Sequence, residues 1–244
     1  IENRINDSIS PQPEYTLDIG EKNTIELTVF SGDKKPYMYK SKAYKRNDTA
    51  TVEVDRAELT RLILAGSNMH YEELPAENQK LTFRELEKRL IAETGIDRCD
   101  INILKTLNLY SDKDGYNIAA ALLADSNNYP GIDIGRFGES ISVIRKRKTL
   151  DNISILAEYE AACEIFRDYY QYEIIEGSLR KTKELIPEEA FRETVANALI
   201  HRVWDVREQI RVFMFEDRIE VYSPGGLPEE LSKEEYLAGN FSKL

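Results

Sequence analysis

One short stretch, residues 191–201, combines a helical apolar pattern with three polar side chains at four-residue steps. Glu193, Asn197 and His201 fall within an arc of roughly 80° if each residue turns a helix by about 100°. Apolar side chains occupy the rest of the circumference: Phe191, Val195, Leu199, Ile200 and Val203. The stretch therefore predicts a helix that carries a carboxylate, an amide and an imidazole together on one side.

This combination of polar groups suits a site for a cation and a phosphate, because Mg²⁺ takes oxygen ligands and shares a nucleotide's phosphates. In such a site Glu193 would position or deprotonate a water, Asn197 would ligate the metal and His201 would contact a phosphate. The alternative is an ordinary surface helix. There Glu193 pairs with Arg192 or Lys183, Asn197 bonds a neighbouring hairpin, and His201 caps the helix end.

A β-hairpin and a glycine loop follow this helix. Residues 209–215 and 218–222 alternate apolar and polar side chains around the turn at 216–217, which predicts two paired strands. The loop at 223–228 contains Gly225 and Gly226, which permit positive φ and close backbone approach; a tight turn alone would also explain them. We expect a further helix over 229–237.

The remainder of the chain predicts an α+β fold with mixed sheets, helices packed on one face, and two modules joined by a helical linker region. We expect a lead-in coil over 1–15. Strands are expected over 23–30, 37–44 and 49–54, before a helix over 58–64. Residues 67–79 have linker composition, and helices are expected over 82–93 and 100–109. Thr82 and Glu85 form a capping-box pattern, and Gly95 is a typical helix stop.

These two short helices fit either a helix-turn-helix unit or a simple packing element. From residue 116 onward, a helix over 117–125 precedes strands over 131–137 and 141–148. A long helix over 153–172 and a strand over 172–175 follow, and Pro187 is placed to open the helix that carries Glu193.

The chain has 33 basic and 44 acidic residues, a net charge of −11, so any contact with nucleic acid must come from a local basic patch. The run at 34–46 is the main candidate, with lysines for phosphates and tyrosines for stacking on bases. Its candidate residues are Lys34, Lys35, Tyr37, Lys40, Lys42 and Arg46. The alternative is a half-buried strand with tyrosines in the core. A second run, 145–148, fits a solvated strand end or a nucleic-acid contact.

Composition also limits the compartment and the metal chemistry. No apolar run approaches the roughly 20 residues that span a membrane, so no membrane partner is expected. Cys99, Cys163, His70 and His201 show no metal-ligand spacing, and a reducing cytoplasm is the expected location. The chain begins at Ile1 without an initiator Met, which predicts a piece of a longer protein.

The order of helix, hairpin and glycine loop resembles the nucleotide site of the GHKL family, which includes gyrase and histidine kinases. Glu193 and Asn197 match the positions of that family's general base and Mg²⁺ ligand. The resemblance implies ATP and Mg²⁺ as cofactors. Where the family has an Asp that recognises adenine, this chain has Ser223 or Pro224.

The fuller phrase from Phe191 to Arg202, with the later run from Asp217 to Pro228, resembles RecG-type ATP-dependent helicase-related proteins and transcriptional regulators. Their usual His-Arg-Asp-Tyr is replaced here by a run ending in Val203, Trp204 and Asp205. The sequence contains no Walker A pattern, so motor helicase activity is not expected and at most a weak ATPase is implied.

Residues 24–64 resemble the end of a Schlafen/AlbA-like module that binds nucleic acid in this family. The resemblances divide the chain into a nucleic-acid module over 1–66, a linker with short helices over 67–112, and a GHKL-like module over 113–244. The implied function is a DNA-associated regulator with a degenerate ATP module, and DNA and a second copy of the chain are the expected partners. The alternative is a scaffold that keeps the ATPase-like fold without binding nucleotide.

Overall fold

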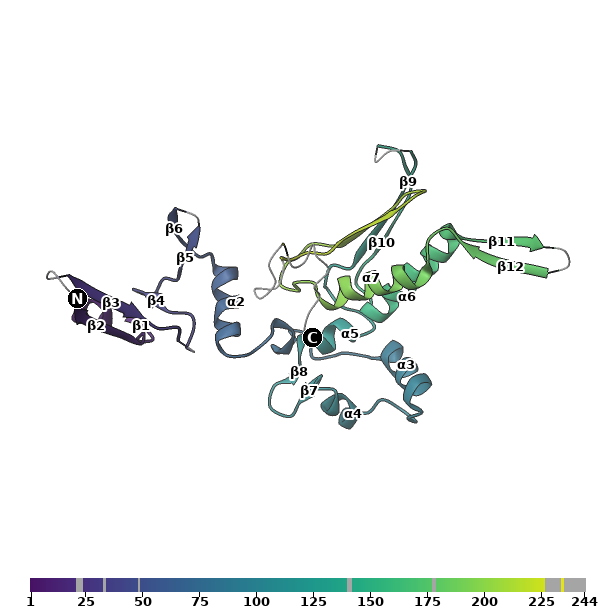
Figure 1. The fold of residues 1–244 in the computed structure, drawn as a ribbon. Coiled ribbons are helices and arrows are strands. Elements are labelled where there is room, and N and C mark those ends of the chain that lie inside the picture. The colour runs from purple at the N-terminus through teal and green to yellow at the C-terminus, as the bar shows by residue number, and fades with distance from the viewer. Residues whose placement is uncertain are drawn as a thin grey trace. The chain divides into compact units, whose positions relative to one another are not determined.

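The computed structural model describes residues 1–226, except 21–23, 33, 48, 140–141 and 177–178, together with Glu234. The chain forms two compact units, Ile1–Leu74 and Pro75–Leu244. Both contain helices and strands, which confirms the α+β prediction (Figure 1). The helix expected over 229–237 lies outside the described residues, apart from Glu234.

The first unit is built from short elements paired locally. Its two-stranded antiparallel sheets join β1 with β4, β2 with β3, and β5 with β6. The elements are α1 (Glu2–Asn6), β1 (Ile9–Ser10), β2 (Tyr15–Ile19), β3 (Ile25–Val29), β4 (Met38–Tyr39), β5 (Tyr44–Asn47), β6 (Ala50–Glu53), α2 (Arg56–Gly66) and a 3₁₀ turn (Tyr71–Glu73). Strands β3 and β6 and helix α2 confirm the corresponding predictions. Asp55 begins α2 by accepting a hydrogen bond from the Glu58 amide at 2.8 Å.

Two predictions for this unit are wrong. Residues 1–15 are not a coil, because they contain α1, β1 and the start of β2. The single strand expected over 37–44 is broken into β4 and β5. Lys40 and Ser41 have φ values of 48° and 66°, and two successive left-handed residues turn the chain out of the extended conformation.

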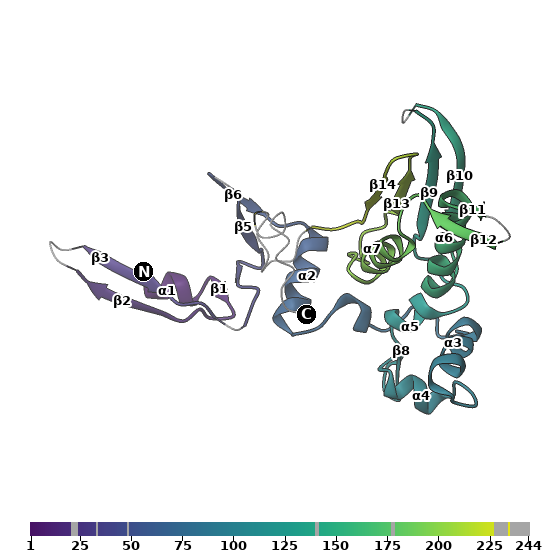
Figure 2. The same cartoon turned by 45° about the vertical axis from the view of Figure 1, so that its right-hand side comes forward.

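The second unit begins with a small helical layer, which Figures 1 and 2 show as one group. It contains α3 (Arg84–Thr94), α4 (Ile101–Thr106), the hairpin β7 (Tyr110–Ser111) and β8 (Gly115–Tyr116), and α5 (Ile118–Leu123). Leu86, Leu104, Leu109 and Ala120 form its core, and Leu156 packs against them. The residues from Pro75 onward belong to this unit, and Leu86 of α3 and Leu104 of α4 pack in its core.

Helix α3 does not begin with the capping box expected at Thr82. Its N-cap is Phe83, which makes no side-chain cap. Asp125 takes over this role: its Oδ1 accepts from the Glu85 amide at 3.2 Å, and its own amide donates to the Thr82 carbonyl at 2.8 Å. The helix ends at Gly95 with φ of 71°, as predicted.

A four-stranded mixed sheet forms the centre of the second unit. Its order is β10 (Ile144–Leu150), β9 (Ile132–Phe137), β13 (Ile210–Met214) and β14 (Ile219–Tyr222), with β9 and β13 parallel and the other pairs antiparallel. Two helices, α6 (Ile155–Tyr170) and α7 (Glu188–Ile200), pack on one face of this sheet, as predicted. The large, fully buried side chains of the shared core include Ile132, Ile134, Phe166, Val195, Ile210, Val212 and Met214.

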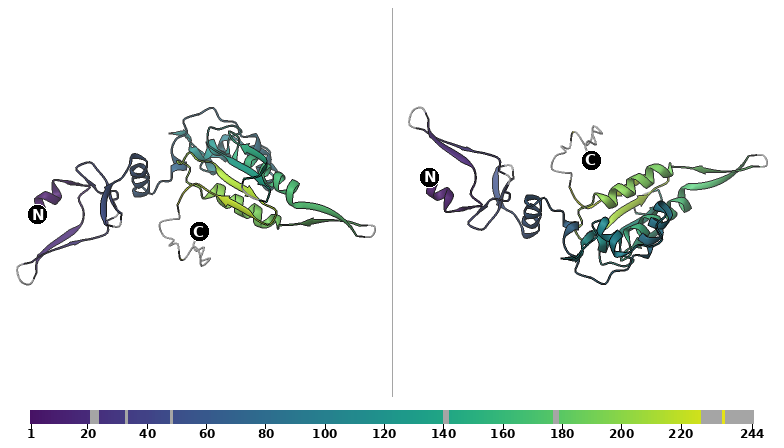
Figure 3. Two further views of the ribbon diagram at one scale, coloured as in Figure 1. Left: turned by 90° about the horizontal axis from the view of Figure 1, so that it is seen from above. Right: turned by 90° about the horizontal axis from the view of Figure 1, so that it is seen from below.

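Helices α6 and α7 are connected by a two-stranded hairpin, β11 (Gln171–Glu176) with β12 (Leu179–Glu184). The sequence predicted one strand here, over 172–175. The hairpin extends away from the end of α6 in several views (Figures 1 and 3). No helix among the described residues combines the length and apolar character needed to cross a membrane.

Candidate functional site

Helix α7 is held on the sheet by its apolar side. Phe191, Val195, Ala198 and Leu199 are buried. The Phe191 ring stacks on Phe166 of α6 with their centroids 4.5 Å apart. Because this side is fixed in the core, the opposite side of α7 faces solvent.

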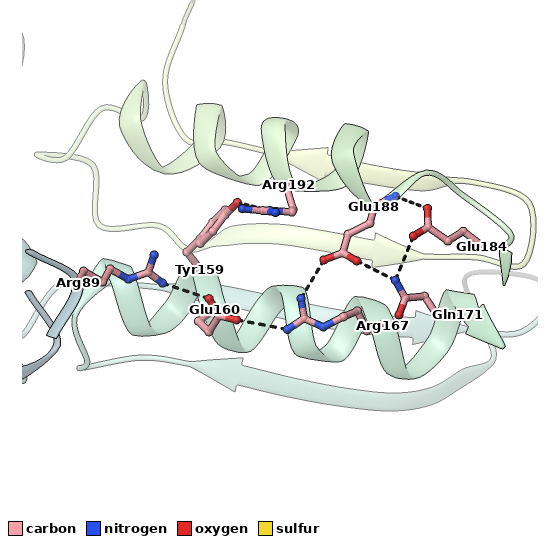
Figure 4. A network of polar contacts seen from close by, with 8 residues as sticks. All are labelled: Arg89, Tyr159, Glu160, Arg167, Gln171, Glu184, Glu188 and Arg192. Carbon is pink, nitrogen blue, oxygen red and sulfur yellow. Dashed lines mark hydrogen bonds and ion pairs between the residues drawn. The ribbon is translucent and has the colours of Figure 1, made fainter. Parts of the chain in front are cut away.

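A polar network anchors the N-terminal end of α7 (Figure 4). The Glu188 carboxylate accepts from Arg167 Nη1 at 2.8 Å and from Gln171 Nε2 at 2.7 Å. The Glu188 amide donates to Glu184 Oε2 at 2.9 Å. These bonds connect α7 to α6 and to both strands of the β11–β12 hairpin, and a carboxylate in the first turn also suits the helix dipole.

Glu193, Asn197 and His201 all lie on the exposed side of this region. Asn197 Nδ2 donates to Glu193 Oε1 at 3.0 Å, so the amide and the carboxylate are in direct contact. His201 is the C-cap residue, and its backbone amide donates to the Asn197 carbonyl at 3.0 Å. Arg192, one alternative partner for Glu193, instead donates to Tyr159 Oη at 3.0 Å.

The glycine loop lies beside the C-terminal end of the same helix. Ser223 Oγ donates to the Ala198 carbonyl at 3.0 Å, and the Val203 amide donates to the Pro224 carbonyl at 2.9 Å. Gly225 has φ of 134°, and a Cβ there would lie 2.6 Å from Val203 Cγ2. This position therefore requires glycine, whereas a Cβ on Gly226 would meet open space. The residues after Gly226, including Leu227 and Pro228, are outside the described part of the loop.

This arrangement leaves specific atoms available to a ligand. Asn197 uses its amide nitrogen toward Glu193. Its Oδ1 makes no hydrogen bond among the described residues and could serve as a ligand for a hard cation. The Ser223 hydroxyl is engaged with the helix end. The described residues contain no cluster of three or more His, Cys, Asp or Glu side chains that could hold a metal.

The candidate nucleic-acid residues of the first unit are at its surface. Lys34, Lys35, Lys40, Lys42 and Arg46 are exposed, and Tyr37 is half-buried. The structure also exposes Tyr39 and Tyr44, so these tyrosines are not core residues as the half-buried-strand alternative required.

Not all of these cations are free of acidic partners. Lys42 Nζ lies 2.7 Å from Glu53 Oε2, and this bond raises the pKa of the lysine, with the Glu53 charge adding to the effect. Lys40 lies against the Tyr39 ring at 5.4 Å from its centroid.

Sequence patterns did not indicate the role of Arg202, which is only 3% exposed. Its guanidinium donates to the carbonyls of Pro130 at 2.7 Å, Glu208 at 2.6 Å and Val206 at 3.2 Å, and lies 4.2 Å from the centroid of the Trp204 ring. It thereby fixes the chain between α7 and β13 against the start of β9. Two of its carbonyl partners follow Arg202 within six residues, whereas Pro130 is 72 residues away, and sequence spacing could not reveal that contact.

A polar cavity of about 450 Å³ was also not predicted. It lies between residues 128–130, 151–152 and 207–211, and Asp151, Arg207 and Arg211 are among its lining residues. Pairing of β9 with both β10 and β13 brings these distant segments together, and no short motif could reveal it.

Comparisons with known proteins match the C-terminal part of the second unit to one family model. Residues 207–243 match the family described as "Putative ATP-dependent DNA helicase recG C-terminal". This segment includes β13, β14, Gly225 and Gly226, and it begins after α7. The match supports a RecG-related, ATPase-like relationship for this part of the second unit.

The solved structures include a similar fold, the DIP2311 protein from Corynebacterium diphtheriae. It aligns with a TM-score of 0.61 and 21% sequence identity, over 95% of this chain and 49% of that protein. At this identity the likeness shows the fold alone, and the chain spans about half the length of that protein. No curated protein matches the chain.

Proposed function

We propose that this chain belongs to a nucleic-acid-associated regulatory protein whose second unit binds ATP with Mg²⁺ on α7. The observation that carries the proposal is the direct contact between Asn197 and Glu193 on the exposed side of a helix whose end contacts the glycine loop. The RecG-related match to β13, β14 and this loop supports it.

The residues present fit the metal and phosphate parts of a magnesium nucleotide, but not its adenine. Asn197 Oδ1 would ligate the cation, which supplies charge neutralisation to the phosphates when bound. Glu193 would orient or deprotonate a water. His201 and the backbone amides of Gly225 and Gly226 would contact phosphate oxygens. Because Ser223 replaces the adenine-recognising Asp, we propose weak binding and at most slow hydrolysis, without motor helicase activity.

Replacing Asn197 by alanine tests this site. We expect the dissociation constant for ATP in the presence of Mg²⁺ to rise at least about tenfold, since a polar contact to a charged group, such as a hydrogen bond, contributes about 1.5–3 kcal/mol. Isothermal titration calorimetry with and without Mg²⁺ measures the effect. Glu189→Gln, an exposed change in the first turn of α7, is the matched control and should bind as the wild type does. Equal affinity in Asn197→Ala, or no heat with the wild type, would refute the proposal.

A second function, a scaffold that retains the ATPase-like fold without nucleotide, is favoured by the bond from Ser223 Oγ to the Ala198 carbonyl. The Ser223 hydroxyl therefore donates to the end of α7 and not to an adenine base. The same titration separates the two functions, because a scaffold shows no Mg²⁺-dependent heat and is insensitive to Glu193→Gln.

The nucleic-acid part of the proposal rests on the exposed lysines of the first unit. We expect Lys34→Glu, Lys35→Glu and Lys40→Glu together to weaken binding of duplex DNA about tenfold or more and to reduce its salt dependence, because phosphate contacts release counterions. Gel shifts at several salt concentrations measure this. A triple control with the same charge change at exposed Lys80, Lys88 and Lys113 should retain most of the affinity. Equal losses in both triples would show a nonspecific charge effect.

A further inference from the structure

Strand β10 separates its four consecutive cations between two sides of the sheet. It is an edge strand that pairs only with β9 in the described sheet. On one side, Arg147 makes a two-pronged bond to Asp133, with Nε to Oδ1 at 2.8 Å and Nη2 to Oδ2 at 2.7 Å. Arg145 pairs with Glu216 at 3.1 Å. The charges of both arginines are therefore matched by carboxylates.

The other side of the strand has an excess of positive charge. A register shift between Ile144 and Lys146 places Lys146 directly opposite Arg136, and Lys148 opposite Ile134. Like charges directly opposite each other destabilise a strand pair. Among the described residues, neither lysine nor Arg136 makes an ion pair.

These three cations line a hollow of about 80 Å³ between the sheet edge and α6. The Tyr169 ring forms one wall, with the Arg136 guanidinium 4.3 Å and Lys146 Nζ 5.8 Å from its centroid. Ile134 and Ile165 are its apolar lining residues, and Asp168 is the acidic group among the lining residues. The aromatic wall holds two cations close together, so that the hollow combines three positive charges with one negative charge.

We propose that this hollow binds a phosphate group, with Arg136, Lys146 and Lys148 as its donors. Arg136 offers the planar fork that suits phosphate oxygens, and the lysines add point charges. Both lysines are exposed and lie about 7 Å apart along the strand, at roughly 3.3 Å per residue. A row of cations on an exposed edge favours the backbone of a nucleic acid over a free phosphate. The site is separate from α7 and does not depend on nucleotide binding there.

The test variant carries both Lys146→Gln and Lys148→Gln. It is compared with a control variant that loses the same amount of charge. Arg145→Gln with Lys113→Gln serves as control, since Arg145 is paired with Glu216 and Lys113 lies near Asp114. Fluorescence anisotropy with labelled duplex DNA is measured at several salt concentrations, and calorimetry with inorganic phosphate forms a second arm. Thermal unfolding checks that both variants remain folded.

We expect the Lys146/Lys148 variant to lose about tenfold or more in DNA affinity. The slope of log affinity against log salt should become shallower by about 2, one unit for each phosphate that the variant no longer neutralises. The control should keep the wild-type slope. If the wild type binds inorganic phosphate but not DNA, and the double variant no longer binds phosphate, the site is supported with a free phosphate as its ligand. Equal slopes in both variants, or no binding of either probe by the wild type, would overturn the proposal.

Discussion

Arg202→Ala is expected to destabilise the protein by about 3–5 kcal/mol, because the change removes a buried charged group together with its hydrogen bonds. The guanidinium donates to three backbone carbonyls, those of Pro130, Val206 and Glu208. All three bonds are partly buried, and each hydrogen bond to a charged group contributes about 1.5–3 kcal/mol. Loss of the stack on Trp204 adds to this.

Urea unfolding followed by circular dichroism measures the effect. Arg202→Lys should also be strongly destabilised, since a lysine has one terminal nitrogen and cannot reproduce the guanidinium fork. Arg207→Ala, at an exposed arginine of the same connection, is the control and should change stability by less than about 0.5 kcal/mol. A loss for Arg202→Ala as small as that of the control would show that the carbonyls find other donors.

Glu158→Gln is expected to gain stability relative to the wild type as the pH rises above about 4.5, to reach its full gain near pH 8, and so to flatten the fall of stability with rising pH. Glu158 is 2% exposed, and its Oε2 makes no hydrogen bond among the described residues. Burial raises the pKa of this carboxyl from its ordinary 4.5 to about 8; the charge of Arg202 opposes the shift and that of Asp151 adds to it.

The direction of the pH effect follows from linkage. Because the folded protein holds this proton more tightly than the unfolded chain, Glu158 contributes its full stability below about pH 4.5. That stability is lost progressively as the pH rises to about 8. The expected gain of Glu158→Gln at high pH is on the order of a few kcal/mol.

Chemical unfolding at a series of pH values measures this gain. Glu164→Gln, an exposed change on the same helix, should keep the wild-type pH profile. A Glu158→Gln profile parallel to that of the wild type would show that Glu158 is ionised in the folded protein at neutral pH.

Arg202 and Glu158 also show which features the sequence could not reveal. The α7 helix, the β13–β14 hairpin and the stop at Gly95 were predicted, because apolar periodicity and turn residues act within a few positions. Glu158 was simply one charged position within a predicted helix. Its burial depends on the packing of α6 against the chain at Gly131, just before β9, and local pattern does not contain that information.

The wrong predictions have the same origin. Thr82 was a plausible cap for α3, but Asp125 supplies the acceptor from a segment 40 residues away from Glu85. At the candidate site, helical spacing correctly brought Glu193 and Asn197 together. The bond between Ser223 and the helix end depends on tertiary packing and could not be read from spacing. The assignment of nucleotide roles to these residues stays a prediction.

Helix α7 is tied down at both ends, by Glu188 to α6 and the β11–β12 hairpin and by the Ala198 carbonyl to Ser223. A shift of the helix along its axis would break both sets of bonds at once. A displacement of α7 on ligand binding at Glu193 and Asn197 would therefore be mechanically coupled to the β11–β12 hairpin and to the glycine loop at the same time.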